Sequence, residues 1–445
     1  MLTSYQIRKY LPLILLIAVS ISVRVFYTRT FPLVASNIDS REYYAIAELF
    51  QKNKDLGALF TPYRAPLYPF ITYIFMILIG RPGYAGDFGG FGVLMSAIAF
   101  FQSALAVIAA LLLFKLLFRI TKSLSTSFIV VLFYTLDMIL IPYERIHLTE
   151  NVALNLTVIM ASALWYVIAH PSVKSFTILL LIGIMQIMLR PAFLALVPLI
   201  LIGIPLLSPR KKTLVLSVIS LAIIFGITQL WTHHNRIRHG LNRFSVYSTI
   251  NILGRIVKDD IPTVGKTKTS ASLTEYRAID GSKNPYDFLN WLDPLFFQKP
   301  EIFIDIDTFN LQTLVTQFPK YTKSALSDLP LAFSSIDTGA ITTDKNSRAW
   351  IFGYMQNFYR LLHILFVSTL LPFMFLAFWI FNRDPTQSIK FGVFLGFLGY
   401  IQVILVTGFL GYEDFSRLAV PYFPLIYIGF GTALDNIRKY AGGHK

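Results

Sequence analysis

Long apolar runs follow one another along most of the chain, separated by short polar stretches. A run of about 20 apolar residues can cross a bilayer as an α-helix. The pattern predicts an all-α polytopic membrane protein with about ten transmembrane helices. The predicted spans are residues 11–29, 92–114, 124–142, 149–169, two in the hairpin 175–207, then 213–231, 358–381, 389–410 and 418–435.

Short basic clusters give these spans a direction. Lysine and arginine gather on the cytoplasmic side of membrane-crossing segments. Such clusters are Arg8-Lys9, Lys115–Lys122 and Arg210–Lys212, and the pair Arg438-Lys439 follows the last span. With all of them inside, both termini face the cytoplasm and the segment 233–356 lies outside.

Two longer stretches interrupt the spans and divide the chain. The first external loop, 30–90, contains the apolar piece Pro66–Gly80, which at about 15 residues is short for a crossing. We expect that piece to be an interfacial or re-entrant helix within a transmembrane module, 1–232. A large external loop, 233–356, follows, and a loop of this length is expected to have secondary structure of its own. The last part, 357–445, holds the C-terminal transmembrane helices.

Composition agrees with a membrane protein and limits the other classes. The chain is 55% hydrophobic and 14% charged, whereas soluble proteins carry about 25% charged residues. The net charge of +15 comes from short clusters between spans, so we exclude nucleic acid as a partner. Without cysteine, the chain can have no disulfide, thiolate metal site or cysteine nucleophile. No small-residue cleavage site follows the first apolar run, which is therefore expected to remain as a helix.

Ionisable residues near the spans gather at their predicted outer ends. Such residues are destabilising in a bilayer, by about 2.5–3.5 kcal/mol at its centre. A set at one interface suggests a site for an anionic, partly lipid substrate, although snorkelling at helix ends explains any single arginine more simply. Asp39 and Glu42 also have the spacing of a helix capping box. The set comprises Arg24, Asp39, Glu42, Arg64, Glu144, Arg145, His147, Glu150, Arg190, Glu413, Asp414 and Arg417.

Five short motifs carry half of these residues. They are Asp39-x-x-Glu42-Tyr43-x-x-x-Ala47, Tyr63-Arg64-Ala65-Pro66-Leu67-Tyr68-Pro69, Leu148-Thr149-Glu150, Arg190-Pro191 and Arg417-Leu418-Ala419-Val420-Pro421. In their order and topological position the motifs resemble GT-C glycosyltransferases, chiefly protein O-mannosyltransferase-like enzymes and lipid A aminoarabinose transferases. The resemblance covers the first 210 residues and the last 30, but not the large external loop.

The resemblance implies a glycosyltransferase that takes a sugar from a polyprenyl-phosphate donor. It makes Asp39 the counterpart of the family's catalytic carboxylate. Some families follow this aspartate directly with glutamate, whereas this chain has Ser40, which leaves a catalytic part for Glu42 less supported. The implied acceptor is a glycan, lipid or protein. The implied location is a bacterial inner or plasma membrane, with membrane lipid around the chain and the active site on the external face, toward the cell envelope.

The chemistry of the residues fits such a transfer. A carboxylate such as Asp39 can accept the proton of an acceptor hydroxyl. One displacement assisted by one base predicts inversion at the anomeric carbon. Arginine binds phosphate as a bidentate fork, and the arginines lie where a lipid phosphate would. The candidates for binding donor phosphate and substrate are Arg64, Arg190, Arg417, Arg24, Tyr63, Tyr68 and Glu150.

This chemistry requires no cofactor. Gly86-Asp87-Phe88-Gly89-Gly90 is glycine-rich but lacks the lysine and the strand–helix context of a phosphate-binding loop, so we expect a flexible turn there. Asp305-x-Asp307 could bind a divalent cation through its oxygens, although two carboxylates in a polar loop are more often simply solvated. We therefore assign no metal site.

Three other functions use similar features. A polysaccharide polymerase or ligase also acts on lipid-linked glycans, but the Asp39 pattern is not expected there. A transporter or flippase would have inverted repeats and helices broken by glycine or proline near the midplane, and we find neither in the sequence. A non-catalytic scaffold would leave the outer charges without a purpose. The sequence specifies neither the sugar, nor the lipid carrier, nor the acceptor.

Overall fold

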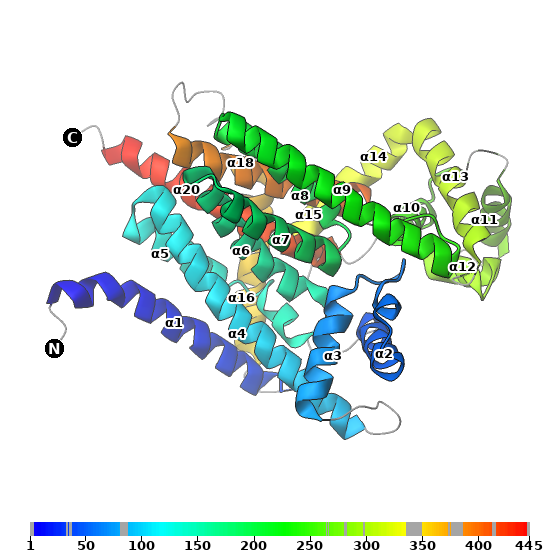
Figure 1. The fold of residues 1–445 in the computed structure, drawn as a ribbon, viewed down its shortest axis with the longest axis horizontal. Coiled ribbons are helices and arrows are strands. Elements are labelled where there is room, and N and C mark those ends of the chain that lie inside the picture. Colours follow the sequence, from blue (N-terminus) through cyan, green and yellow to red (C-terminus); the bar gives the residue numbers. More distant parts are fainter. Residues whose placement is uncertain are drawn as a thin grey trace.

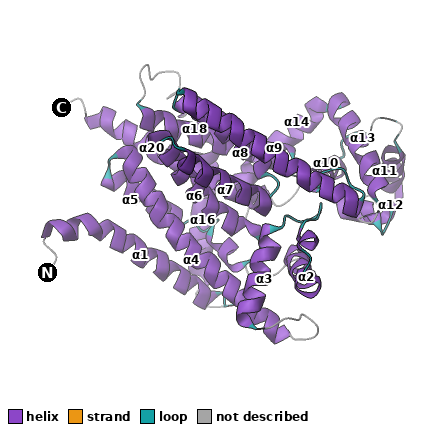
Figure 2. Cartoon of the chain, in the orientation of Figure 1, coloured by secondary structure: helices purple, strands orange, loops and turns teal. Residues whose placement is uncertain are grey.

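The computed structural model is helical, in agreement with the all-α prediction. Every regular element among the described residues is a helix (Figure 2). The structure describes residues 4–32, 34, 38–80, 88–263, 265, 267–279, 283–296, 299–334, 349–372, 374, 386–411 and 415–442. Glu413, Asp414, Gly86 and Asp87, which the sequence analysis singled out, lie outside these ranges.

Among the described residues, six helical stretches are long and apolar enough to cross a membrane. They coincide with six of the predicted spans, and the chain therefore has the architecture of a multi-pass helical membrane protein. The stretches lie in α1 (Ser4–Thr30), α4 (Phe88–Thr121), α6 (Thr149–Ala169), α9 (Lys211–His239), α18 (Gln387–Gln402) with η6 (Val403–Phe409), and α19 (Phe415–Ala419) with η7 (Val420–Tyr422) and α20 (Phe423–Gly442).

Other apolar helices of the described chain are shorter. They are α3 (Leu67–Ile79), α5 (Leu124–Thr135), α7 (Val173–Leu189) and α8 (Phe193–Leu207). Arg190 and Pro191 form the turn between α7 and α8, as predicted. The predicted span 358–381 begins earlier than expected, since α16 (Ala349–Leu362) continues directly into the π-helix η5 (His363–Leu370). The count of ten spans remains a prediction.

The predicted span 124–142 is not one continuous helix. α5 ends at Thr135 after 12 residues, and a 3-10 turn, η2 (Ile141–Arg145), follows. Asp137 lies at the break, where its carboxylate accepts a hydrogen bond from the Ile139 N–H at 2.9 Å. Such a local side-chain bond offers the backbone an alternative to the helix, and it explains why an apolar run ends early.

The segment predicted to be the first external loop folds into α2 (Ile38–Asn53), a 3-10 turn, η1 (Leu56–Leu59), and α3. The 13 residues of α3 rise about 20 Å, which is less than the ~30 Å of a hydrocarbon core. α3 ends at Gly80, whose φ of 69° is left-handed and favours glycine. The short helix agrees with the predicted length, and its interfacial position remains a prediction.

The predicted large loop is mostly helical, as its length suggested. α9 continues to His239 and α16 begins at Ala349, so helices occupy both ends of the range 233–356. Between them, buried aromatic and aliphatic side chains form a core separate from that of the long helices. The helices of this region are α10 (Tyr247–Lys258), α11 (Lys268–Ile279), α12 (Pro285–Leu292), α13 (Pro300–Thr316), α14 (Phe318–Ser327) and α15 (Leu329–Ser334).

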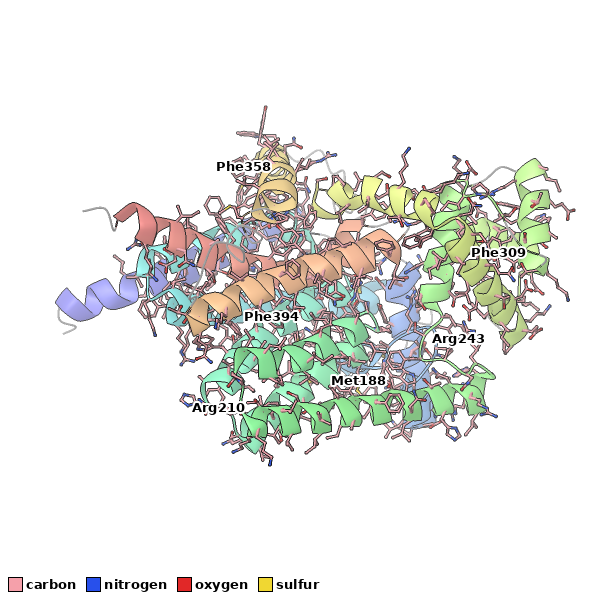
Figure 3. All side chains as sticks on the ribbon, turned by 90° about the horizontal axis from the view of Figure 1, so that it is seen from above. Met188, Arg210, Arg243, Phe309, Phe358 and Phe394 are labelled. Carbon is pink, nitrogen blue, oxygen red and sulfur yellow. The ribbon has the colours of Figure 1, made fainter. Side chains whose placement is uncertain are left out.

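The two sides of the molecule hold different parts of the chain. Figure 1 shows both chain ends on one side and α10–α13 on the other, with α2 toward the latter side. α9 joins the two sides, with Arg210 at its start and Arg243 just beyond its end (Figure 3). The predicted topology requires this arrangement, because it places the basic, cytoplasmic ends of the spans opposite the external segments.

Close helix contacts hold the bundle together. α4, α6, α18 and α20 share one large buried core. α18 approaches α20 at Gly399, where an added Cβ would lie 2.9 Å from Ile426 Cγ1. Small residues at such crossings let helices pack closely where no water is present to drive their association. This packing places the start of the last span beside α6, which brings Arg417 close to the start of that helix.

Candidate active site

Asp39 lies in the first turn of α2, and its two carboxylate oxygens face two different arginines. Oδ1 accepts a hydrogen bond from Arg64 Nη2 at 2.5 Å, and Oδ2 pairs with Nη2 of Arg417. Arg64 lies between η1 and α3, whereas Arg417 opens the last candidate span. The tertiary fold therefore assembles this contact. The capping-box spacing suggested that the Asp39 carboxylate caps the helix, whereas in the structure its two oxygens form ion pairs.

Arg64 joins Asp39 to Glu42, one turn further along α2. Its Nε donates to Glu42 Oε2 at 2.6 Å. A local turn holds the arginine, since Thr61 Oγ1 accepts from the Arg64 N–H at 2.9 Å. The guanidinium also lies 5.5 Å from the ring of Tyr43 and 4.6 Å from that of Tyr247, within the range of cation–π attraction. These contacts fix Arg64 while leaving Glu42 partly exposed.

Glu150 supplies a second, fully buried carboxylate at the start of α6. Its Oε1 lies 2.8 Å from Arg190 Nη1 and 2.5 Å from Arg417 Nε. Negative charge is favoured at a helix N-terminus, which agrees with the position of Glu150 in the first turn of α6. Arg417 thus bridges Glu150 to Asp39, and Arg190 adds a third guanidinium to the same site.

These six side chains form a continuous chain of ion pairs, which we call the ion-pair network. Its members are Glu42, Arg64, Asp39, Arg417, Glu150 and Arg190. The three carboxylates balance the three guanidinium groups. Sequence motifs far apart along the chain contribute to it, and all six residues were predicted site residues. An added anion would have to compete with carboxylates for the arginines.

The charges of the network set the protonation of Asp39. Burial alone would raise the pKa of this carboxyl group, but the nearby guanidinium groups of Arg417 and Arg64 outweigh it and hold the pKa below its ordinary value. Burial alone would lower the pKa of Arg64, and its neighbours Tyr247, Tyr43, Asp39 and Glu42 raise it instead. Asp39 is therefore ionised at neutral pH, and both of its oxygens are already paired with arginines.

Arg24, the fourth predicted phosphate-binding arginine, forms a separate pair. Its Nε and Nη2 donate to the two oxygens of Glu144 at 2.9 and 2.6 Å, and its Nη1 donates to Ser20 Oγ at 2.7 Å. Both charged side chains are buried. This bidentate geometry links α1 to the η2 turn, so Arg24 has a structural partner outside the ion-pair network.

The two predicted tyrosines occupy supporting positions. Tyr68 is fully buried, packs edge-on against Tyr43 at 4.9 Å and reaches Gln102 Oε1 at 3.4 Å. It thereby supports a ring that lies against Arg64. Tyr63 packs against the core formed by the helices after α9, and burial raises the pKa of its phenol. It connects the segment between η1 and α3 to that region.

Tyr247 is a site residue that the sequence analysis missed. It opens α10, and a backbone hydrogen bond from Val246 N to Pro62 O at 3.0 Å brings it beside Arg64. Its ring covers the guanidinium at 4.6 Å. The segment 233–356 matched no family motif, so nothing in the sequence marked this tyrosine.

The two loop aspartates considered for metal binding have other partners. Asp305 Oδ2 accepts from Thr269 N and Oγ1 at 2.7 and 2.6 Å. Asp307 pairs with Arg243 at 2.6 Å and accepts from Thr249 Oγ1 at the same distance. The described part of the chain contains no cluster of three or more metal-binding side chains. Both carboxylates therefore join helices of this region to one another.

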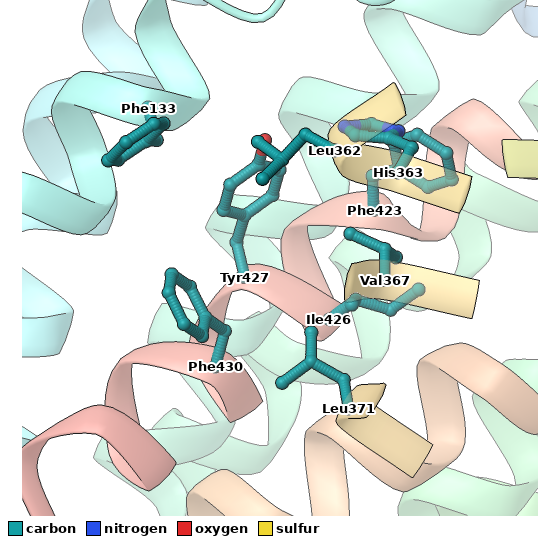
Figure 4. A pocket seen from close by; sticks show the side chains of 9 residues that line it. All are labelled: Phe133, Leu362, His363, Val367, Leu371, Phe423, Ile426, Tyr427 and Phe430. Carbon is teal, nitrogen blue, oxygen red and sulfur yellow. The ribbon is translucent and has the colours of Figure 1, made fainter. Parts of the chain in front are cut away.

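A cavity of about 240 Å³ lies inside the bundle and not at the ion-pair network. Seven apolar side chains line it, together with His363 and Tyr427 (Figure 4). These two residues both reach the buried carboxylate of Asp137, from His363 Nε2 at 2.9 Å and from the Tyr427 hydroxyl at 2.8 Å. The cavity is thus apolar with one polar end.

No protein-family model matches this chain, and no curated protein matches it either.

Proposed function

We propose that this chain is a membrane glycosyltransferase that moves a sugar from a polyprenyl-phosphate donor to an acceptor hydroxyl at the external face. The observation that carries the proposal is the meeting of Asp39 with Arg64 and Arg417, two guanidinium groups on one carboxylate. A carboxylate base and phosphate-binding forks are the two groups that the transfer needs.

Donor binding would activate Asp39 by taking its arginines away. A phosphate is an anion that arginine binds through two parallel hydrogen bonds, so it competes directly with Asp39 for Arg64 and Arg417. As either guanidinium turns to the phosphate, Asp39 loses a partner that lowers its pKa. Its carboxylate then becomes both more basic and free to accept a proton.

The transfer is a single displacement. The acceptor oxygen forms a bond to the anomeric carbon as its proton passes to Asp39. The bond from that carbon to the phosphate oxygen breaks, and its electron pair leaves with the lipid phosphate. Arg190 and Arg417 would stabilise the departing charge, since preorganised donors act where charge develops. Attack opposite the leaving group inverts the anomeric carbon.

Features of the helical stretch that begins at Arg417 support the proposal that the donor is lipid-linked. Arg417 starts the last candidate span. Four residues of α20, Phe423, Ile426, Tyr427 and Phe430, line the cavity on the same helical stretch. An apolar cavity in a bundle does not hold water well. A ligand with its charged head at Arg417 and its hydrocarbon chain among the helices would use both features.

The proposed location is a bacterial inner or plasma membrane, with the ion-pair network at the external face. Basic clusters would keep both termini in the cytoplasm, and α2 lies toward the side of the molecule opposite the chain ends (Figure 1). The acceptor would then approach from the side of α10–α13.

A binding screen on purified protein tests this function. Lipid-phosphate sugars with different sugar heads are titrated, with the bare lipid phosphate and a nucleotide sugar beside them. We expect saturable binding of at least one lipid-phosphate sugar, and weaker or no binding of the nucleotide sugar. Binding of none of the lipid-phosphate sugars, together with no transfer from any, would contradict the proposal.

A further inference from the structure

Arg255 is a completely buried arginine outside the ion-pair network. It lies on α10 and reaches two other parts of the chain. Nη1 donates to Ser324 Oγ at 2.8 Å and to Asp328 Oδ2 at 3.0 Å. Nη2 donates to the backbone carbonyls of Thr407 and Gly411, at 3.4 and 2.5 Å. One guanidinium therefore ties α14 and its end to the end of the penultimate candidate span.

The carbonyls that Arg255 binds lie in the last turn of a helix and just beyond it. Residues Val403–Phe409 form the π-helix η6, and the last carbonyls of any helix lack partners within it. Tyr321 of α14 supplies a further donor, since its hydroxyl binds the Phe409 carbonyl at 2.5 Å. The helices after α9 thus bind three carbonyl groups where η6 ends.

Arg255 and Lys258, both on α10, also lie against the segment that carries Arg417. The ring of Phe415, two residues before Arg417, lies 5.7 Å from the Arg255 guanidinium and 4.7 Å from Lys258 Nζ. Gly411 also packs so tightly that an added Cβ would lie 2.8 Å from Leu418 Cδ1. Contacts therefore fix the chain both before and after the position of Arg417.

We propose that Arg255 is a positioning residue that sets the place of Arg417, and through it of the ion-pair network. It does so by holding the end of η6 and the ring of Phe415 in one geometry. The donor-binding part of this inference rests on the proposed function, whereas the coupling of Arg255 to Arg417 does not. Through this contact the helices after α9 would act on a site that lies mainly on other elements.

The test compares Arg255→Met with a matched control. Methionine fills similar space without donors, so it removes the bonds to Thr407 and Gly411. The control is Arg277→Met, because Arg277 lies in the same region and also binds two backbone carbonyls, those of Ile261 and Ile256 at 3.1 and 2.8 Å. Ile256 directly follows Arg255 on α10 and Ile261 lies just beyond the end of that helix, so the control removes carbonyl bonds near Arg255 without touching those to Thr407 and Gly411.

Donor affinity is measured for each variant alone and in an Arg417→Ala background. Arg255→Met should weaken binding of the lipid-phosphate sugar roughly tenfold, within the range of couplings seen inside one network. In the Arg417→Ala background it should change nothing further. Arg277→Met should leave affinity unchanged in both. An equal loss with and without Arg417, or no loss at all, would overturn the inference.

Two further measurements keep the test decisive. The first is thermal unfolding of the same variants, which does not depend on any donor. The shifts in Tm caused by Arg255→Met and Arg417→Ala should be non-additive, and additive shifts would refute the coupling even if no donor binds.

The second applies if Arg255→Met fails to fold. Tyr321→Phe then removes only the hydroxyl bond to Phe409. It should weaken donor binding in wild-type protein and have no effect beside Arg417→Ala; loss in both backgrounds would count against the proposal.

Discussion

Arg190 and Arg417 share one buried carboxylate, that of Glu150. Alanine at either position should weaken donor binding roughly tenfold or more, because a hydrogen bond to a charged group contributes about 1.5–3 kcal/mol. Lysine should restore only part of the affinity, since an ammonium group lacks the planar fork. Binding is measured by titrating purified, monodisperse protein with the donor.

Arg238→Ala is the control for these variants. Arg238 also pairs with a carboxylate, that of Asp55, but at an exposed position. Its loss should leave donor affinity unchanged. If both Arg190→Ala and Arg417→Ala kept wild-type affinity, the two arginines would be helix anchors and no part of a phosphate site.

The pH dependence of transfer should reveal the release of Asp39 from its arginines. Burial would raise the pKa of Asp39 in the free protein, but Arg417 and Arg64 hold it below its ordinary value, which is about 3.9. A bound phosphate that draws an arginine away raises that pKa. The base acts when ionised, so the rate falls as pH drops through the pKa.

Rate profiles separate the two states. The acid limb of kcat/KM reports the free enzyme and that of kcat reports the donor complex. We therefore predict that the acid limb of kcat lies at higher pH than that of kcat/KM. Coincident limbs, or the reverse order, would exclude the proposed exchange of partners at Asp39.

At the residue scale, six of the predicted site residues meet in the ion-pair network, but the sequence did not predict how they pair. Asp39, Arg64 and Arg417 carry family-like motifs, and the structure brings them into direct contact. The partner of Arg24 could not be predicted, because contact with Glu144 depends on how α1 packs beside the η2 turn. Tyr247 carried no signal, since its segment matches no motif.

At the element scale, the membrane side of every later segment depends on whether α3 crosses the membrane. Its 13 residues are too few to cross about 30 Å of hydrocarbon at 1.5 Å per residue. Cysteines introduced singly at positions 53 and 87 should therefore react alike with a membrane-impermeant thiol reagent added from outside. The chain has no native cysteine to interfere. Reaction at only one of the two positions would show that α3 crosses.

Hydropathy predicted where the spans lie better than where the helices end. α5 stops at Thr135 because Asp137 binds its own local backbone. α9 runs past its apolar part to His239, where Gly240 ends it with a left-handed φ of 68°. Apolarity reports burial in lipid or protein, whereas caps and local hydrogen bonds set helix ends. The helices between α9 and α16 were expected only as secondary structure of an unspecified kind.

At the scale of the whole molecule, the topology is the claim on which the site depends. Single cysteines at position 445 and at position 283, in the segment after α11, provide the check. Impermeant reagent added to intact cells should label position 283 and leave position 445 unlabelled, because basic clusters hold the termini inside. Labelling of 445 but not 283 would show that the protein has the opposite orientation, with the ion-pair network on the cytoplasmic side.

Contacts between the helices after α9 and the rest of the chain could not be predicted from the sequence. Val246 binds Pro62 through the backbone, and Arg255 binds Thr407 and Gly411. Each contact joins segments more than a hundred positions apart, and backbone carbonyls carry no sequence signature. The sequence therefore indicated two membrane parts, 1–232 and 357–445, and the polar segment 233–356 between them, whose contacts with one another only the structure provides.

The substitution Asp39→Asn tests the central claim most directly, with sugar transfer and donor binding measured on the same purified protein. An amide cannot accept the proton, so transfer should fall by about 10²–10⁴-fold while donor binding persists through the arginines. Asp55→Asn is the matched control, because Asp55 caps η1 and pairs with Arg238 away from the site. If Asp39 served only to pair with Arg64 and Arg417, asparagine would instead lower Tm and donor binding together with transfer. Near-normal transfer by Asp39→Asn would contradict the account.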